Sequence, residues 1–464
     1  MGGGAQTWGV LIEEASVLLE NVLFAVIFVF GFLILSYLPT KSKLWLIGLT
    51  SPFQIYVVSL AGFDPSLNLV FILSLWLIAI KSSQYVIRHV LVKILFGLLV
   101  FQILSLLWSS NFFLGIQTIL SSLSFLFLLV ASYRVEISQP GTINRILAFT
   151  LIMMIINSIL VIAFRLNPSF EHAFLSSHFA NKIIEPDTLS SLLSGVLKNN
   201  ILDTEKSGGF FVNANVSSVY VGVGVFIAWG ISGFRNLRWI RWVMVLLWSS
   251  IFFTGSKVAL ILGICFPVLA WLITLLAKYE RQYWLLGLVV LSMIVMTSFV
   301  IVYGEFDSSM VNKLDNFIVA LRSRMEIWSY AKQIFLETPF WGQGFGNWQK
   351  GFSSYAVIHN INEYFPPHNT IIALWSQSGL LVVFLGIWFM VETLKIAYHF
   401  HLLPNASFSM WGRMFGIASF WIFLQGFGEN YGLFGDSHIL VLFALGIGLS
   451  LAKLDLLKRE KHVA

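Results

Sequence analysis

Charged residues are scarce in this sequence, and their scarcity excludes a soluble globular protein. Asp, Glu, Lys and Arg make up 11% of the 464 residues, whereas soluble domains carry about 25%. Hydrophobic residues make up 58% and recur in continuous runs of roughly 18 or more, the length that crosses a hydrocarbon layer. The runs lack the alternation of membrane β-strands. The composition therefore predicts an all-α, polytopic membrane protein.

Cysteine and N-terminal basic residues are also nearly absent. The single cysteine, Cys265, excludes a disulfide framework and a thiolate metal cluster. The first twenty residues contain no Lys or Arg, so we expect no cleavable signal peptide. The net charge of +6 does not indicate nucleic-acid binding, because the basic residues cluster in short loops between apolar runs.

Ionisable residues are missing from the centres of the predicted spans. Glu20, Lys93, Lys257 and Glu392 all fall near span ends. Ion-coupled transporters usually keep acidic groups or histidines at mid-bilayer, and many show internal repeats, which we do not find here. A small-solute transporter remains the alternative from a different functional class.

The apolar runs predict about 12–13 spans in a single integral membrane domain, 1–464. They lie at 18–38, 44–61, 67–80, 90–107, 112–132, 146–164, 211–233, 240–254, 257–277, 283–303, 369–397, 414–428 and 437–452. If the spans alternate, 18 of the 28 Lys and Arg residues fall on one side, which the positive-inside rule makes cytoplasmic. Two long loops, 165–210 and 304–367, then face outward.

The first outer loop is polar and leads into a span through Asn213 and Asn215. These two asparagines are expected either to cap the span or to contact a polar ligand. A metal site in this loop is disfavoured, since His172 and His178 lack a carboxylate at ligand spacing. Between two later spans lies Lys257, which either snorkels to lipid headgroups or neutralises a phosphate.

The second outer loop carries residues suited to anion binding. Residues 323–326 (SRME) read as a capping box. This predicts an amphipathic helix that starts at Arg324, ends near Pro339 and lies on the outer membrane surface or at the rim of the bundle. A helix start favours anions through its free amides and its dipole. We therefore expect Arg324 to bind phosphate, with Arg322 as a possible further contact. An exposed arginine near lipid headgroups is the competing interpretation.

A glycine-rich turn and a histidine complete this loop. Residues 342–346 (GQGFG) lack the spacing of a dinucleotide fingerprint and predict a closely packed turn. His368 follows two prolines and precedes Asn369, which is expected to cap the next span. A histidine at this boundary can accept a proton near neutral pH. His359, also followed by Asn, precedes no span.

Taken in order, these motifs resemble the O-antigen ligase/polymerase family. Its pattern is a small residue, Arg, three residues and Trp, then Pro-x-x-Gly-x-Gly-x-Gly, then His-Asn and Gly-Leu. The matching segments here are 323–328 (SRMEIW), 339–346 (PFWGQGFG), 368–369 (HN) and 379–380 (GL). Earlier, 213–215 (NAN) resembles the family's Asn-Pro-Asn. Residues 254–257 (TGSK) resemble Thr-x-Ser-Arg, with Lys257 where the family has Arg.

The resemblance implies a GT-C-like, inverting glycosyltransferase in the bacterial inner membrane, with its active site facing the periplasm. The donor would be an undecaprenyl-diphosphate-linked glycan, and the acceptor a sugar hydroxyl on a glycan or a lipid-linked sugar. Arg324 and Lys257 would bind the diphosphate, and His368 would act as general base. Asn213, Asn215, Arg322 and Asn369 are possible substrate contacts. No metal, other cofactor or nucleic acid is expected.

Two further interpretations stay open at this stage. A protein O-oligosaccharyltransferase would use the same donor but a protein acceptor. A structural membrane subunit would make the capping box, the glycine turn and the His-Asn pair incidental.

Overall fold

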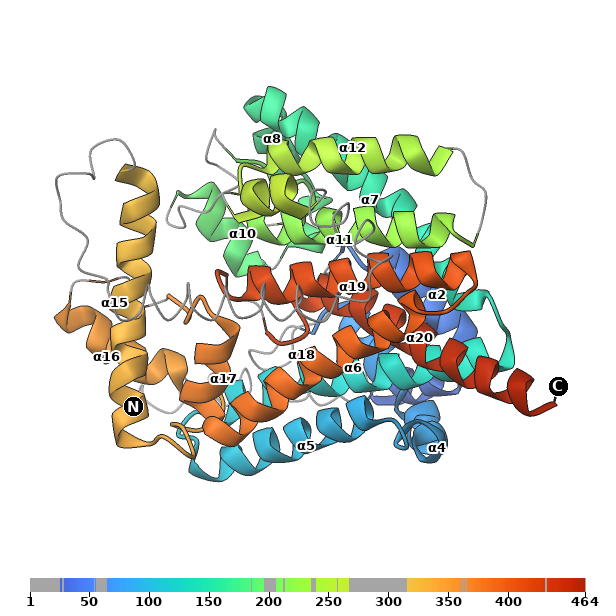
Figure 1. Ribbon diagram of the computed structural model, residues 1–464. Helices are drawn as coiled ribbons and strands as arrows, with labels where there is room; N and C mark the ends of the chain where they lie inside the picture. The colour runs from blue at the N-terminus through green and yellow to red at the C-terminus, as the bar shows by residue number, and fades with distance from the viewer. Residues whose placement is uncertain are drawn as a thin grey trace, which may run out of the picture.

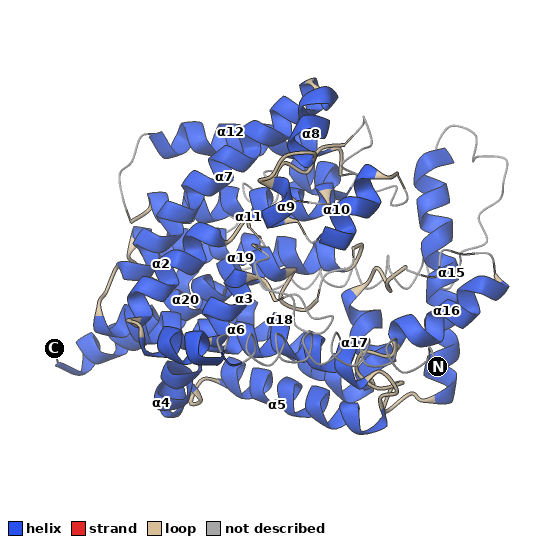
Figure 2. Ribbon diagram, turned by 180° about the vertical axis from the view of Figure 1, so that it is seen from behind, coloured by secondary structure: helices blue, strands red, loops and turns tan. Residues whose placement is uncertain are grey.

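The protein is described by a computed structural model and consists of helices and loops. The model describes residues 26, 29–53, 55, 65–184, 186–195, 206–211, 213–234, 239–256, 258–266, 315–359, 361, 363, 365–429 and 432–463. Figure 2 shows helix and loop in this part of the chain and no strand. The predicted all-α class is therefore confirmed.

The long helices run roughly parallel to one another and form a bundle (Figure 1). The helices are α2 (Thr40–Thr50), α3 (Leu67–Leu73), α4 (Trp76–Val86), α5 (Val90–Ser105), α6 (Phe112–Ser138), α7 (Thr142–Leu166), α8 (Pro168–Leu175), α9 (Ala180–Ile183), α10 (Pro186–Leu193), α11 (Ala214–Ser232), α12 (Trp239–Thr254), α15 (Asp315–Glu337), α16 (Trp348–Ile358), α17 (Thr370–Ser378), α18 (Leu380–His401), α19 (Ala406–Gly426) and α20 (Ser437–Val463).

Six helical segments within the described ranges are long and apolar enough to cross a membrane. They are Val90–Trp108, Phe112–Ser138, Thr142–Leu166, Ala214–Ser232, Leu380–His401 and Ser437–Glu460. A seventh span is possible if α3 and α4, bent by 51°, count as one. The chain is thus a multi-pass membrane protein. Predicted span 283–303 lies outside the described residues, so the total of about 12–13 stays a prediction.

Besides 67–80, which includes the bend between α3 and α4, two predicted spans differ from the structure. The run 44–61 is helical only as far as Thr50 in the residues that can be described. The run 369–397 is not one helix but two, because the chain breaks at Gly379, where φ is 80° and ψ is −177°. Glycine alone adopts this conformation readily. Both errors arise because apolar composition continues through a break in backbone direction.

Helices α11 and α20 form the centre of the bundle. About 83% of the apolar window of each is buried, compared with 39–44% for the other four candidate spans. Helix α11 packs on α19 and α12, and α20 packs on α6. At Gly222 the α11 backbone lies directly against the ring of Trp421, since small residues let membrane helices approach closely. The less buried helices form the surface that contacts lipid.

Asparagine side chains begin four of the helices. The side-chain oxygens of Asn111, Asn213, Asn369 and Asn405 accept hydrogen bonds from backbone amides in the first turns of α6, α11, α17 and α19. Such caps satisfy amides that lack a partner within the helix. The capping predicted for Asn213 and Asn369 is therefore confirmed.

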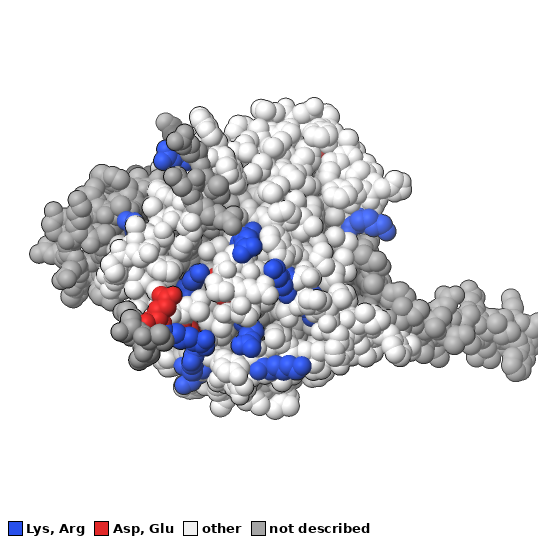
Figure 3. Space-filling view, turned by 90° about the vertical axis from the view of Figure 1, so that its right-hand side faces the viewer, with Lys and Arg blue, Asp and Glu red and all other residues white. Residues whose placement is uncertain are grey.

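The end of the bundle that carries the C-terminus is basic. Figure 3 looks onto this end and shows Lys and Arg side chains gathered on it. Two buried carboxylates fix the ends of helices here. Asp455 of α20 pairs with Arg88 and accepts a hydrogen bond from Tyr133 at 2.7 Å, and Glu136 pairs with Lys453 at 3.0 Å. This basic end agrees with the cytoplasmic side predicted from the charge distribution.

Helices α15, α16 and α17 lie at the opposite end. Helix α15 crosses the ends of the long helices instead of running parallel to them (Figure 1). Its buried residues Ile327, Ala331 and Ile334 pack with Phe352 of α16 and Ile372 of α17. The predicted amphipathic helix at the rim of the bundle is confirmed, and its position places the second outer loop over one end of the spans.

Candidate functional site

The glycine-rich turn fixes the second outer loop to the bundle. Gly342, Gly344 and Gly346 all have positive φ, and the backbone of Gly344 lies against that of Ser109 in the α5–α6 connection. The Gly344 amide donates to the Gln377 carbonyl at 3.0 Å, and the Gly346 amide donates to the Gln377 side chain at 2.9 Å. The predicted role of this turn, backbone packed on backbone, is confirmed.

The two prolines place His368 at the mouth of the α17–α18 segment. The Pro367 carbonyl accepts a hydrogen bond of 2.9 Å from the Trp328 indole of α15. Among the described residues, His368 is the only non-glycine residue with positive φ, 49°. This strained conformation persists because both flanking segments are held.

The environment of the His368 imidazole keeps it neutral. Its Nδ1 is buried and has no hydrogen-bond partner among the described residues. Burial, followed by the positive charge of Arg324, lowers the pKa of His368 to about 4. At neutral pH the ring therefore has an unprotonated nitrogen that can accept a proton.

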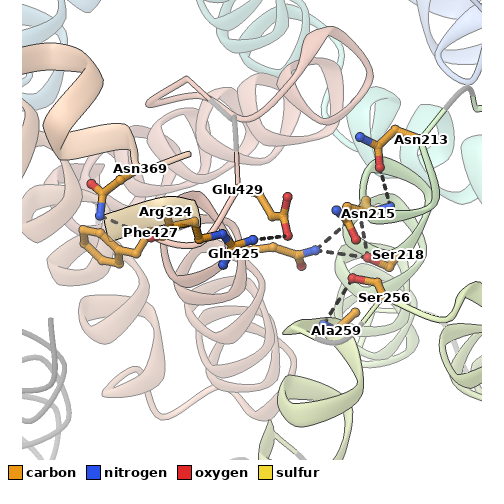
Figure 4. Close-up of polar contacts among 10 residues, drawn as sticks. All are labelled: Asn213, Asn215, Ser218, Ser256, Ala259, Arg324, Asn369, Gln425, Phe427 and Glu429. Atoms are coloured by element: carbon orange, nitrogen blue, oxygen red, sulfur yellow. Dashed lines mark hydrogen bonds and ion pairs between the residues drawn. The ribbon is translucent and has the colours of Figure 1, made fainter. Parts of the chain in front are cut away.

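The side chain of Asn369, the residue after His368, forms hydrogen bonds through both its oxygen and its nitrogen. Its Oδ1 accepts from the amides of Ile371 and Ile372 at 2.9 and 3.1 Å. Its Nδ2 donates to the Phe427 carbonyl at 3.2 Å, where α19 ends. Asn369 thus ties the start of α17 to the end of α19 and keeps the adjacent His368 in place (Figure 4).

Arg324 does not start a helix, so the capping-box prediction is wrong. Helix α15 begins at Asp315 and continues through Ser323 and Arg324 to Glu337. A Ser-x-x-Glu sequence also fits inside a helix, where neither side chain has to cap. The free amides and dipole of a helix start are therefore not available at Arg324. Arg322 lies in the same helix, where the structure describes its backbone only.

Arg324 instead forms an ion pair with a buried carboxylate from another part of the chain. Its Nη2 lies 3.3 Å from Oε1 of Glu429, in the loop between α19 and α20. The Glu429 side chain is 8% exposed and that of Arg324 is 24% exposed. Burial raises the pKa of Glu429, and the nearby charge of Arg324 opposes this rise. The Arg324 guanidinium is thus partly exposed and lies beside the buried carboxylate of Glu429.

A chain of amide side chains continues from Glu429 into the bundle. The Asn215 side chain of α11 is hydrogen-bonded to Glu429. Gln425 of α19 donates to the Asn215 carbonyl at 3.3 Å and to Ser218 Oγ at 3.0 Å, and its Oε1 accepts from Trp421 at 2.7 Å. Figure 4 shows the Arg324–Glu429 pair and the hydrogen bonds of Gln425 to Asn215 and Ser218 in α11.

The turn that follows α12 lies beside Arg324. A Cβ on Gly428 would lie 3.5 Å from Val258 and 3.6 Å from Arg324 Nη1, so these two residues flank one glycine. Ser256 Oγ accepts from the Ala259 amide at 3.4 Å and starts the helical segment 258–266. Lys257 itself lies outside the described residues; Val258, the residue after it, lies near Gly428, as Arg324 does.

Residues 242–387 match the family model described as O-antigen ligase. This segment of the chain is similar to the O-antigen ligase family. The match includes the 254–257 turn, α15, the glycine turn and the His368–Asn369 pair, so the resemblance read from the motifs is confirmed. No curated protein matches the chain.

Part of the candidate site lies outside the segment matched to the O-antigen ligase model. Asn213 and Asn215 precede it, and Glu429 and Gln425 follow it. Of these four, the motif analysis identified only the two asparagines. Glu429 did leave a signal in the sequence, since it is the only acidic residue between Glu392 and Asp436 and follows an apolar run.

An acid–histidine pair lies in the loop before α20 and at its start. Asp436 Oδ2 lies 2.6 Å from Nδ1 of His438, and Asp436 Oδ1 accepts from the Ile439 amide at 3.0 Å. The His438 ring meets the Phe211 ring edge to face at 4.6 Å. The pair caps α20 and contacts the 206–211 segment, which precedes Asn213.

The structure therefore brings together most of the predicted residues. Arg324, His368, Asn369 and Asn215 converge at the end of the bundle where α15 lies, connected through Glu429 and Phe427. The structure describes neither Lys257 nor the side chain of Arg322. Within the described ranges, no group of three or more His, Cys, Asp or Glu residues is placed to hold a metal ion.

Proposed function

We propose that the protein transfers a glycan from an undecaprenyl-diphosphate carrier to a sugar hydroxyl, as a ligase or polymerase of O-antigen-type surface polysaccharide. The observation that carries this proposal is that a partly exposed guanidinium lies close to a neutral imidazole within the segment matched to O-antigen ligase. Arg324 and His368 are close enough for the charge of one to lower the pKa of the other. An arginine suits phosphate recognition, and a neutral imidazole suits proton removal from a hydroxyl.

In this reaction the acceptor oxygen attacks the anomeric carbon of the donor sugar from the side opposite the diphosphate. The bond from that carbon to the phosphate oxygen breaks, and the configuration is inverted. Arg324 and Lys257 bind the diphosphate and stabilise the charge that develops on it. His368 takes the proton of the acceptor hydroxyl. The diphosphate is itself a good leaving group, so we expect neither a metal ion nor another cofactor to be required.

Donor binding also makes His368 a better base. The charge of Arg324 lowers the pKa of His368 in the free protein. A bound diphosphate compensates that charge, and the pKa of the imidazole then rises towards neutrality. Proton removal is thereby favoured when the donor is in place. Asn213, Asn215, Arg322 and Asn369 are proposed as further substrate contacts.

The orientation follows from the two ends of the bundle. The basic end faces the cytoplasm of a bacterial inner membrane under the positive-inside rule. The end with α15, Arg324 and His368 then faces the periplasm. This orientation gives the site access to a flipped lipid-linked donor and to membrane-bound acceptors.

Glycan analysis in a deletion strain tests the proposal. Complementation with wild-type protein is expected to restore the polysaccharide ladder in electrophoresis, whereas His368→Ala and Arg324→Ala fail to restore it. His359→Ala and Lys332→Ala are matched controls, because His359 also precedes an asparagine and Lys332 lies exposed on α15. If the His368 and Arg324 variants accumulate in the membrane and still restore the ladder, the catalytic assignment is wrong.

The same gel separates the two reaction types. Loss of a ligase leaves lipid A–core without long glycan, whereas loss of a polymerase leaves cores with single repeat units. For Lys257 we expect Lys257→Arg to keep activity and Lys257→Gln to lose most of it. Equal activity of both variants would assign Lys257 to membrane anchoring. Transfer by purified protein is expected to be unchanged by EDTA.

A further inference from the structure

The ion pair between Arg324 and Glu429 occupies the guanidinium that the donor needs. Glu429 is nearly enclosed, and its described polar neighbours come from three elements. Arg324 belongs to α15, Asn215 to α11 and Lys206 to the 206–211 segment. His368, just before α17, is close enough to Arg324 for the guanidinium charge to lower its pKa. Arg324 provides the direct ion pair to this buried carboxylate and opposes the rise of its pKa that burial causes.

A buried carboxylate is costly once its cation turns to another partner. An isolated charge in a protein interior is so unfavourable that the group usually becomes neutral instead. An anion that binds Arg324 would weaken the pair and also bring negative charge towards Glu429. Both changes favour the protonated acid, because they remove attraction and add repulsion.

We propose that binding of a diphosphate to Arg324 breaks its pair with Glu429 and that Glu429 then takes up one proton from solvent. Before binding, Arg324 and Glu429 neutralise each other. After binding, Arg324 neutralises the diphosphate, and Glu429 is an uncharged acid that keeps its hydrogen bond to Asn215. No covalent bond other than the new O–H bond changes. The inference rests on the proposed diphosphate binding and adds a positioning residue, Glu429, to it.

A pH dependence of donor affinity follows from this exchange. The protonated acid is the form that accompanies the bound donor, so low pH favours binding. The affinity falls as the pH rises from the pKa of Glu429 in the free protein to its higher pKa in the complex, by up to tenfold for each pH unit. Burial already raises the pKa of Glu429 above its ordinary value in the free protein, which moves this range towards neutrality.

Titration calorimetry with farnesyl diphosphate tests the exchange. Purified protein in detergent is titrated near pH 8 in two buffers with different heats of ionisation, and the difference in binding heat counts the protons. We expect wild-type protein to take up about one proton for each diphosphate bound. Glu429→Gln should bind the ligand without this proton uptake. Glu337→Gln changes an exposed carboxylate at the end of α15 and should behave like wild type.

The outcomes separate the inference from the proposed function. Diphosphate binding by wild type without proton uptake, or with uptake that persists in Glu429→Gln, overturns the inference and leaves the proposed function standing. Absence of binding to wild-type protein overturns both. Any protonation of farnesyl diphosphate itself occurs with wild type and variant alike, so it cancels when their proton uptakes are subtracted. If Glu429→Gln does not fold, His368→Asn provides the second measurement, because it removes the other group whose pKa rises on donor binding: uptake that persists in His368→Asn supports Glu429, and uptake that is lost in it overturns the inference.

Discussion

The unusual environment of His368 predicts that the protein loses stability in mild acid. Its pKa is about 4 in the folded protein, whereas an ordinary histidine side chain has a pKa of 6.5. Because the folded-state pKa is the lower one, the neutral ring is favoured by folding. Its stabilising contribution is fully present above pH 6.5, is lost as the pH falls towards 4, and is gone below that value.

The size of this effect follows from the two pKa values. A drop from 6.5 to about 4 corresponds to about 3 kcal/mol of folding free energy. At pH 5 the loss should have reached about 2 kcal/mol, since each pH unit in this range contributes about 1.4 kcal/mol. The same pKa places the acid limb of the activity profile of the free enzyme near pH 4 if His368 is the general base.

Thermal unfolding of purified protein in detergent at pH 7.5 and pH 5 measures the stability effect. The matched variant is His368→Asn, because asparagine tolerates the positive φ of this position and does not titrate. Other titrating groups contribute equally to both proteins, so the difference between their pH dependences isolates His368. His359→Asn, at an exposed position, should keep the wild-type pH dependence. If wild type and His368→Asn lose the same stability on acidification, the burial argument is refuted.

Three further substitutions test other parts of the site and its support. Gly379→Ala should prevent accumulation of folded protein, because φ is 80° and the new Cβ would collide with the Phe340 carbonyl. Its control, Gly141→Ala, has a similar φ of 83° but its Cβ meets open space, so it should only lower the melting temperature. Burial raises the pKa of Glu171 to about 8, so wild type loses stability as the pH rises from 4.5 to 8, whereas Glu171→Gln does not. The variant should gain about 1 kcal/mol over wild type for each pH unit in this range; melting temperatures that change in parallel with pH would contradict this. Asn369→Ala should cost about 1–2 kcal/mol in unfolding through its lost cap and should reduce transfer as well, which glycan gels would detect; unchanged stability would disprove the capping role.

Local features of this protein could be predicted from the sequence because they depend on neighbouring residues. The cap at Asn369, the buried stripe of α15 and the packed glycine turn all follow from residue type at short spacing. Long apolar runs likewise predicted the bundle, since crossing a membrane requires length and hydrophobicity alone. For the same reason α12 was located to within one residue, Trp239–Thr254 against 240–254.

The errors concern features that local patterns do not encode. The Ser-x-x-Glu sequence at 323–326 is compatible with a helix start and with a helix interior, and residues further upstream decide between them. The break at Gly379 is hidden by the apolar residues on both sides of it. The partnership of Arg324 with Glu429 spans 105 positions, and only the packing of α15 against the end of the bundle brings these side chains together.

The contacts around Glu429 also set the point in synthesis at which the candidate site can be complete. Asn215 meets Gln425 across 210 positions, and Arg324 meets Glu429 only after α19 has been made. A nascent chain that has inserted everything up to His368 therefore still lacks the groups that orient its arginine. Under the proposed function, the growing polypeptide could not act on carrier lipid before the loop that carries Glu429 has been inserted, because Arg324 lacks its ion-pair partner until then.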